Sequence, residues 1–189
     1  ALAFVGADLG RGIVSGFTPD IVHVHDWQAA LTPAYLHYGD GVRPAAVMTV
    51  HNLAFQGLFP RELLPALGLP PRAFALDGLE DHGGISYLKA GLALADHVTT
   101  VSPTYAAEIC TAEHGMGMDG VLRQRGDAIS GILNGIDVNV WNPATDMSIP
   151  SRFEVAPGPA TLRAVLVEAD EITGMAQSIT RLQVPPDRC

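Results

Sequence analysis

The chain has few cysteines, few basic residues and no long apolar run, and each shortage excludes a class of protein. Its 189 residues include 2 cysteines, Cys110 and Cys189, too few for the disulfide framework of a small secreted domain, so we expect free thiols. No apolar stretch approaches the roughly 20 residues that cross a bilayer. The first residues also lack an initiator Met and the basic region of a signal peptide. We therefore expect a cytoplasmic protein whose true start is missing.

Positive charge is equally scarce. The 11 Lys and Arg residues stand against 20 Asp and Glu residues, which gives a formal net charge of −9. Lys89 is the single lysine, and the arginines are scattered along the chain. The long-range field of such a protein repels polyanions, which excludes nucleic acid and anionic membrane surfaces as partners. A small phosphorylated ligand, held by a few local contacts, stays compatible with this charge.

The sequence does contain four apolar, strand-like runs that each stop at a cluster of polar residues. In an open sheet of parallel strands, ligands bind at the carboxyl ends of the strands, so four polar strand ends predict one shared pocket. Helical segments lie between the runs, and this alternation predicts an α/β fold with a Rossmann-like, mostly parallel sheet. The runs and their polar ends are Ile21–Val24 with His25 to Gln28, Ala45–Val50 with His51 and Asn52, His97–Val101 with Ser102 and Pro103, and Ile129–Leu133 with Asn134 to Asp137.

Four segments between these runs have helical character. Ser86 and Ser102 are suited to the N-cap position, where a side-chain oxygen accepts a hydrogen bond from the first turn. Beyond Asp146 the alternation stops and prolines become frequent. We therefore expect a domain at residues 1–146, and at 147–189 a divergent tail that is helical or loosely ordered, with one or two helices in Leu162–Leu182. The expected helices before it are Gln28–Tyr38, Pro60–Leu64, Tyr87–Ala95 and Pro103 to about Thr111.

Two motifs admit other interpretations. His23 and His25 are two positions apart on a strand, share one face, and with Asp26 could bind a metal ion. Spacing alone is weak evidence, and the more ordinary interpretation is one histidine packed in the core and one hydrogen-bonded at the strand end. The glycine-rich patch from Gly115 to Gly120 is a weak candidate for a phosphate-binding loop, since it matches neither the Walker pattern nor the full dinucleotide-binding fingerprint. The sequence therefore predicts no metal and no cofactor.

Five longer strings resemble the bacterial glycogen synthase and starch synthase family. The resemblance runs almost continuously from Pro19 to Asp146 and preserves order and spacing, which makes it far more specific than a short motif. The strings are DIVHVHDWQAALTPAYL from Asp20, TVHNLAFQGLFP from Thr49, ISYLKAGLALADHVTTVSPTYAAEI from Ile85, GMGMDGVLRQR from Gly115 and GILNGIDVNVWNPATD from Gly131.

The resemblance implies part of the N-terminal, acceptor-side domain of a GT-B glycosyltransferase. Such an enzyme transfers glucose from ADP-glucose to the non-reducing end of an α-1,4-glucan and retains the anomeric configuration without a metal. Carried over by motif, Asp26 and His51 are expected beside the transferred glucose, and Asn134 is expected to bind a sugar hydroxyl. Asn52 and Gln56 are expected in the substrate-binding loop, where they support the loop more than the chemistry.

These roles suit a transition state with oxocarbenium character. A carboxylate such as Asp26, or an oriented carbonyl such as that of His51, stabilises positive charge near the anomeric carbon. The His51 imidazole and the Asn134 amide can hold the sugar hydroxyls and with them the reacting geometry.

The sequence also departs from the family. A complete synthase has a Lys-x-Gly-Gly-Leu loop, and a second domain with an Arg and a Lys for the diphosphate and a glutamate before Pro-Cys-Gly-Leu, none of which this sequence shows. We interpret the echo of that glutamate segment at Glu154 as coincidence. The fragment alone is therefore expected to be inactive. Two alternatives stay open: a non-catalytic glucan-binding domain, and a metal-dependent hydrolase that uses His23, His25 and Asp26, with His51, His82 or His97 as further ligands.

Overall fold

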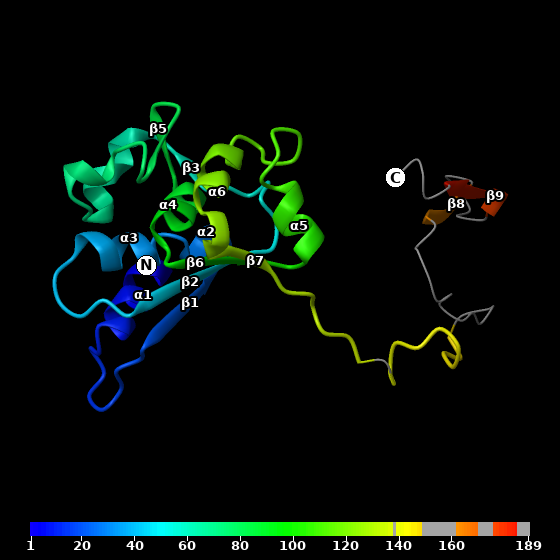
Figure 1. Ribbon diagram of the computed structural model, residues 1–189, viewed down its shortest axis with the longest axis horizontal. Coiled ribbons are helices and arrows are strands. Elements are labelled where there is room, and N and C mark those ends of the chain that lie inside the picture. Colours follow the sequence, from blue (N-terminus) through cyan, green and yellow to red (C-terminus); the bar gives the residue numbers. More distant parts are fainter. Residues whose placement is uncertain (138, 149–161, 170–175, 185–189) are drawn as a thin grey trace. The chain divides into compact units, whose positions relative to one another are not determined.

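The computed structural model describes residues 1–137, 139–148, 162–169 and 176–184, with the backbone alone for the last two ranges (Figure 1). The chain divides into two units, Ala1–Gly135 and Ile136–Cys189. The predictions for Glu154 and Cys189 lie outside the described residues. Within the described part, no helix combines the length and the apolar character that a bilayer crossing demands.

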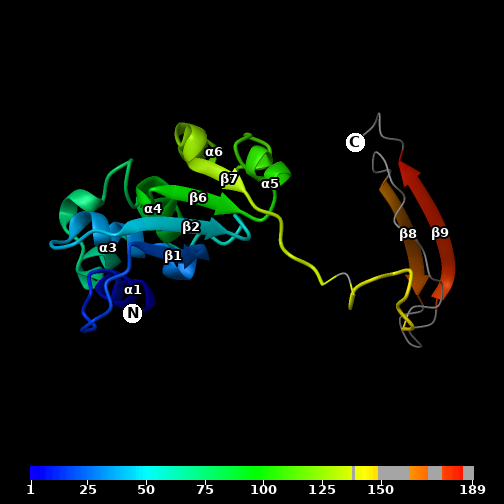
Figure 2. The ribbon, with the colours of Figure 1, turned by 60° about the horizontal axis from the view of Figure 1, so that its bottom comes forward.

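A parallel four-stranded sheet forms the centre of the first unit, which confirms the predicted α/β class. Its strand order is β1-β2-β6-β7, and each neighbouring pair is parallel, as Figure 2 shows. Each of the four strands begins at the predicted residue and ends within two residues of the predicted end. They are β1 (Ile21–His25), β2 (Ala45–Val50), β6 (His97–Thr100) and β7 (Ile129–Gly131).

One face of the sheet is apolar and forms the core with two helices. Val24, Met48 and Val98 stand in one row across three strands and are at most 6% exposed. Leu88 and Leu92, one turn apart on a helix, and Leu122 on a second helix pack against this row. The two helices are α4 (Tyr87–Leu94) and α6 (Asp119–Gln124).

The opposite face carries a row of polar side chains because residues alternate sides along each strand. His25, Thr49, Thr99 and Ser130 are paired in register from β1 to β7. Thr49 and Thr99 are at most 8% exposed, and their hydroxyl groups lie 2.5 Å apart. This polar row leads to the carboxyl edge of the sheet.

Two predicted N-caps are confirmed. Ser86 precedes α4 and accepts a hydrogen bond from the N–H of Lys89 at 3.1 Å. Ser102 precedes α5 (Pro103–Glu108) and accepts one from the N–H of Tyr105 at 2.9 Å. Each cap fixes the residue at which its helix begins.

The single helix predicted over Gln28–Tyr38 is wrong in detail, since the structure has two shorter helices. These are α2 (Asp26–Ala29) and α3 (Thr32–Tyr38). Pro33 lies at the start of α3, where it lacks the N–H that would bond to the carbonyl of Ala29 in a continuous helix. The break therefore falls where a proline is tolerated, in the first turn of the second helix.

Several elements were absent from the sequence-based prediction. Helix α1 (Leu2–Gly10) precedes the sheet, and a small antiparallel sheet of order β3-β5-β4 lies within the Pro- and Gly-rich segment. That segment has 3-10 helices in place of the predicted short helix. The remaining bounds are β3 (Leu58–Phe59), β4 (Glu80–Asp81), β5 (Gly84–Ser86), η1 (Arg61–Leu67), η2 (Pro71–Ala73) and η3 (Gly126–Ala128).

The helices predicted for Leu162–Leu182 are wrong. The second unit contains an antiparallel pair, β8 (Leu162–Ala169) and β9 (Ala176–Val184), with Leu162 paired to Val184. The first segment contains two β-branched residues and the second three, and such residues lose side-chain freedom in a helix and favour extended backbone. This preference outweighs the helical character of the leucines and alanines among them.

Candidate functional site

The ends of β1 and β2 meet as the strand-end rule predicts. His25 is the last residue of β1, and His51 directly follows β2. The Asp26 carboxylate accepts a hydrogen bond from the backbone N–H of His51, with 2.8 Å between Oδ1 and N. Asp26 has a φ of 53°, a left-handed conformation that is uncommon for a residue with a side chain. This turn lets Asp26 leave the strand and reach across to the neighbouring strand end.

Three histidine rings stand in a row beside this bond. The rings of His23 and His25 stack with 4.5 Å between centroids, and His25 Nδ1 lies 3.1 Å from His51 Nε2. His23 Nε2 lies 2.6 Å from the Thr49 hydroxyl oxygen. Burial lowers the pKa of His23 below its usual value of 6.5, and the neighbouring His25 and His51 lower it further. The row therefore favours a neutral imidazole at His23.

The loop after His51 is held by bonds to its own backbone and to α4. Asn52 Oδ1 accepts a hydrogen bond from the N–H of Ala54 at 3.0 Å, so this side chain closes a turn. The carbonyl of Gln56 accepts bonds from the Ser86 hydroxyl and the Leu88 N–H, both at 3.1 Å. In this structure the Asn52 side chain and the Gln56 carbonyl therefore both hold the loop.

Gly57 has a reason to be glycine at the end of this loop. Its φ is 60°, and a Cβ built there would lie 2.6 Å from the Trp27 ring. Trp27 in turn packs near Phe59 and Tyr87, with ring centroids 6.1 Å and 6.4 Å away. The close approach sets the loop directly against the tryptophan that follows Asp26.

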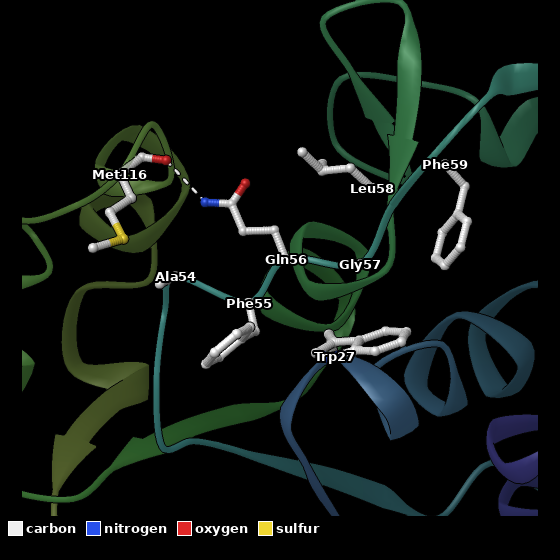
Figure 3. Close-up of a pocket in the computed structure, with 8 residues that line it drawn as sticks. All are labelled: Trp27, Ala54, Phe55, Gln56, Gly57, Leu58, Phe59 and Met116. Carbon is white, nitrogen blue, oxygen red and sulfur yellow. Dashed lines mark hydrogen bonds between the residues drawn. The ribbon is translucent and has the colours of Figure 1, made fainter.

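A hollow of about 550 Å³ lies over this loop (Figure 3). Gln56 Nε2 donates a hydrogen bond to the carbonyl of Met116 at 2.9 Å and so joins the loop to a segment 60 residues later. Phe55 is 61% exposed and Met116 56% exposed, both at the hollow. Its lining consists of Trp27, Ala54, Phe55, Gln56, Gly57, Leu58, Phe59 and Met116.

Asn134 lies apart from the other predicted site residues. It is exposed in the irregular segment after β7, and β7 is two places from β2 in the strand order. At ordinary strand spacing that is about 10 Å. Asn134 follows the carboxyl end of β7 by three residues, and among the described residues no hydrogen bond joins it to Asp26 or His51.

His97, a candidate metal ligand, and Lys89, the single lysine, both have partners away from Asp26 and His51. Across the described residues, no group of three His, Cys, Asp or Glu side chains is arranged to hold a metal ion. His97, the first residue of the four-residue strand β6, is hydrogen-bonded to the Ser130 hydroxyl at 2.9 Å. Lys89 is 8% exposed, bonds to the carbonyl of Glu80, and has its Nζ 3.9 Å from Asp81 Oδ1. Its charge is held away from the strand ends.

Sequence reasoning missed three features of this site. Phe55 and Met116 were not singled out, although an exposed aromatic residue within a loop at a strand end is a readable signal. The contact between His25 and His51 was also missed. The four strand ends were predicted to share one edge of the sheet, but no pattern in the sequence shows that the side chains of His25 and His51 will meet.

Comparison with known protein families gives a match over most of the chain. A family model described as the starch synthase catalytic domain matches residues 1–124. The glycogen synthase of Rhodopseudomonas palustris (strain BisA53) is 61% identical over 160 residues, which are 85% of this chain and 33% of that protein. The glycogen synthase of Acidiphilium cryptum (strain JF-5) is 61% identical over 156 residues, 82% of this chain and 33% of that protein.

A solved structure supports the same grouping. The catalytic domain of starch synthase IV from Arabidopsis thaliana, bound to ADP and acarbose, superposes with a TM-score of 0.65 and 35% identity. The match covers 78% of this chain and 31% of that one. This chain therefore spans about a third of the length of the curated relatives and of the solved structure that it matches.

Proposed function

The chain belongs to the family of starch synthase catalytic domains, and from that premise we propose that it serves glucosyl transfer from ADP-glucose to the non-reducing end of an α-1,4-glucan. It would supply acceptor-side residues of a GT-B glycosyltransferase that retains the anomeric configuration. The observation that carries the proposal is the hydrogen bond between Asp26 and the backbone of His51 at the carboxyl ends of neighbouring strands. We propose a cytoplasmic location for the protein, because nucleotide sugars are found in the cytoplasm.

Asp26 and His51 are the proposed catalytic residues. Positive charge develops on the sugar ring in the transition state, and a fixed carboxylate close to it lowers the barrier. Asp26 uses Oδ1 to hold His51, and this bond orients both the carboxylate and the His51 peptide before substrate arrives. Such preorganisation is what makes an electrostatic contribution effective in the transition state.

The hollow beside the loop is the proposed place for a sugar ring. Aromatic faces such as those of Phe55 and Trp27 are suited to the apolar C–H face of a hexose, and a cavity of about 550 Å³ is in the range of ligand sites. Gln56 is proposed to bind a hydroxyl at the rim, with Asn52 shaping the turn before it. The starch synthase IV neighbour was solved with acarbose, a sugar analogue.

Asn134 is proposed to bind a hydroxyl of the same ligand from the far end of the sheet edge. The distance of about 10 Å between β2 and β7 exceeds a direct hydrogen bond, so the ligand itself would bridge the two ends. This role requires the segment after β7 to face the hollow when a glucan is bound.

A second candidate function is glucan binding without transfer. The buried, paired state of Lys89 favours it, because a diphosphate needs fixed cations and this lysine is turned away from the strand ends. On this view the chain alone would hold glycogen through the aromatic hollow. Affinity electrophoresis of the chain in a glycogen gel, compared with a Phe55→Ala variant, measures such binding directly.

The decisive experiment exchanges this chain for the matching part of a relative. Residues 1–124 replace the corresponding segment of the Rhodopseudomonas palustris (strain BisA53) glycogen synthase, and the chimaera is assayed for radiolabelled glucose moving from ADP-glucose to glycogen. We expect activity within roughly tenfold of the parent. Removing one preorganised stabilising group typically costs about 10²- to 10³-fold in rate, so His51→Ala and Asp26→Asn should each lose about that much.

The control is Asp20→Asn, which removes the same charge from an exposed position before β1. It should leave transfer unchanged. A folded chimaera without activity, or His51→Ala and Asp26→Asn chimaeras as active as the control, would overturn the proposed function. The chain by itself, assayed under the same conditions, should show no transfer.

A further inference from the structure

His25 has no role in the proposed reaction, yet its ring lies between the rings of His23 and His51. Its ring stacks on His23 on one side, while its Nδ1 lies 3.1 Å from Nε2 of His51 on the other. The ring centroids of His25 and His51 are 5.3 Å apart and tilted by 36°. The close approach of two nitrogens makes this second contact a side-chain hydrogen bond.

A hydrogen bond between two imidazoles restricts where protons can be. One of the two facing nitrogens must carry hydrogen and the other must accept it, so two proton arrangements satisfy the bond, and each gives His51 Nδ1 the opposite role. A neutral imidazole carries hydrogen on one nitrogen only, so the state of Nε2 in His51 decides the state of its Nδ1. Protonating both rings would place two positive charges side by side and abolish the acceptor.

The ring of His23, which lies behind His25, is linked to the sheet by hydrogen bonds. His23, on which it stacks, is 2.6 Å from the Thr49 hydroxyl, and Thr49 is 2.5 Å from the Thr99 hydroxyl in the next strand. Both threonines are buried within the parallel sheet. His25 therefore presents its Nδ1 from a fixed platform, and Asp26 holds the backbone of His51 from the next residue in the chain.

The nitrogen of His51 that remains is Nδ1. Among the described residues no hydrogen bond reaches it, and His51 is an exposed residue at the strand edge. A sugar hydroxyl can both donate and accept, so a ring nitrogen with one defined role selects one orientation of that hydroxyl. A fixed role for Nδ1 is thus a means of setting the sugar's orientation.

We propose that His25 is a positioning residue that holds His51 in one tautomer and one ring orientation, so that His51 Nδ1 keeps a single hydrogen-bonding role toward the sugar. The part concerning the sugar rests on the proposed function. The part concerning the tautomer concerns this chain alone and is testable without any substrate.

The test is nitrogen-15 NMR of the histidine rings in the full 189-residue chain at about pH 7.5. His51 is assigned by the loss of its signals in His51→Gln. In the unaltered chain we expect two well-separated ring nitrogen signals for His51, one protonated and one not, as a single tautomer gives. Two averaged signals in the unaltered chain would overturn the proposal without any variant at position 25.

Two substitutions separate the hydrogen bond from the stack. His25→Phe keeps a ring against His23 and removes the bond, while His25→Asn keeps a polar group near the place of Nδ1 and removes the ring. One hydrogen bond shifts such an equilibrium by roughly two- to tenfold. His51 should therefore show averaged tautomers in His25→Phe and regain one tautomer in His25→Asn. The matched control is His97→Phe, which breaks another histidine bond on the same sheet, that to Ser130.

The outcomes are distinct. Averaging in His25→Phe but not in His97→Phe supports the proposal, and unchanged His51 signals in a folded His25→Phe overturn it. Averaging in both variants also overturns it, because a general loosening of the sheet would explain the result. Addition of maltoheptaose then tests the contact with the sugar. If His51 keeps one tautomer but its Nδ1 signal does not change with the glucan, the positioning role of His25 stands and the result counts against the proposed function.

Discussion

The left-handed turn at Asp26 lends itself to a graded set of substitutions. Asp26 contributes through two features, a φ of 53° and the 2.8 Å bond from its carboxylate to the His51 N–H. Asn preserves both, because it tolerates a positive φ and offers an oxygen at the same place. Gly preserves the turn and loses the bond. Ala loses the bond and adds the cost of placing a Cβ in the left-handed region.

The expected magnitudes follow from these losses. A hydrogen bond of this kind contributes about 1 kcal/mol to the free energy of unfolding. A left-handed conformation costs a residue such as Ala about 1 kcal/mol, whereas for Gly the relief of strain and the extra flexibility of the unfolded chain roughly cancel. We therefore expect losses of about 0 kcal/mol for Asp26→Asn, about 1 for Asp26→Gly and about 2 for Asp26→Ala.

Urea denaturation followed by circular dichroism measures these differences, with the slope against urea checked for constancy. Asp20→Ala is the control, since it removes a carboxylate from the residue before the same strand and should change stability by less than about 0.5 kcal/mol. If Asp26→Ala matched Asp26→Gly, the positive φ would not be retained in solution. If Asp26→Gly matched Asp26→Asn, the bond to His51 would contribute nothing, and the basis of the site would fail.

Three further predictions concern the fold and its pH dependence. Gly91→Ala should lower the free energy of unfolding by about 1–3 kcal/mol, since its Cβ would lie 2.2 Å from Met48 Sδ, whereas Gly120→Ala, with open space around it, should raise the thermal midpoint. Arg125→Lys should destabilise the chain in urea, because the guanidinium donates to three carbonyls at the end of α4, and an equal midpoint would refute this. The lowered pKa of His23 means that the folded state takes up its proton at lower pH than the unfolded state. Stability should therefore fall as pH drops below about 6.5, and His23→Gln should flatten that dependence.

Much of the first unit was predictable because its signals are local. The four strand runs are short, apolar and β-branched, and Ser86 and Ser102 are cap residues directly before helical segments. Each of these preferences acts within a few residues, so a single sequence is enough to detect it. The helix break at Pro33 was also local, and a stricter use of the proline rule would have found it.

The candidate site likewise has features that local sequence patterns predict and features that they do not. That Asp26 and His51 would lie at one sheet edge follows from two neighbouring strands that end in polar residues. The 60-residue separation between Gln56 and Met116, joined by one hydrogen bond, has no counterpart in any local pattern. The exposed lining of the hollow, with Phe55 and Met116, depends on how two loops approach each other.

By itself the amino-acid sequence determined the alternation of strands and helices, the parallel sheet and the polar character of its carboxyl edge, because these follow from short-range preferences and periodicity. Only the tertiary structure decided that His25 meets His51 and that Asp26 holds the His51 backbone. The direction of a side chain at a strand end depends on a turn such as the left-handed one at Asp26 and on the register of the neighbouring strand. Register is a property of the packed sheet, in which pairings distant along the chain are chosen together.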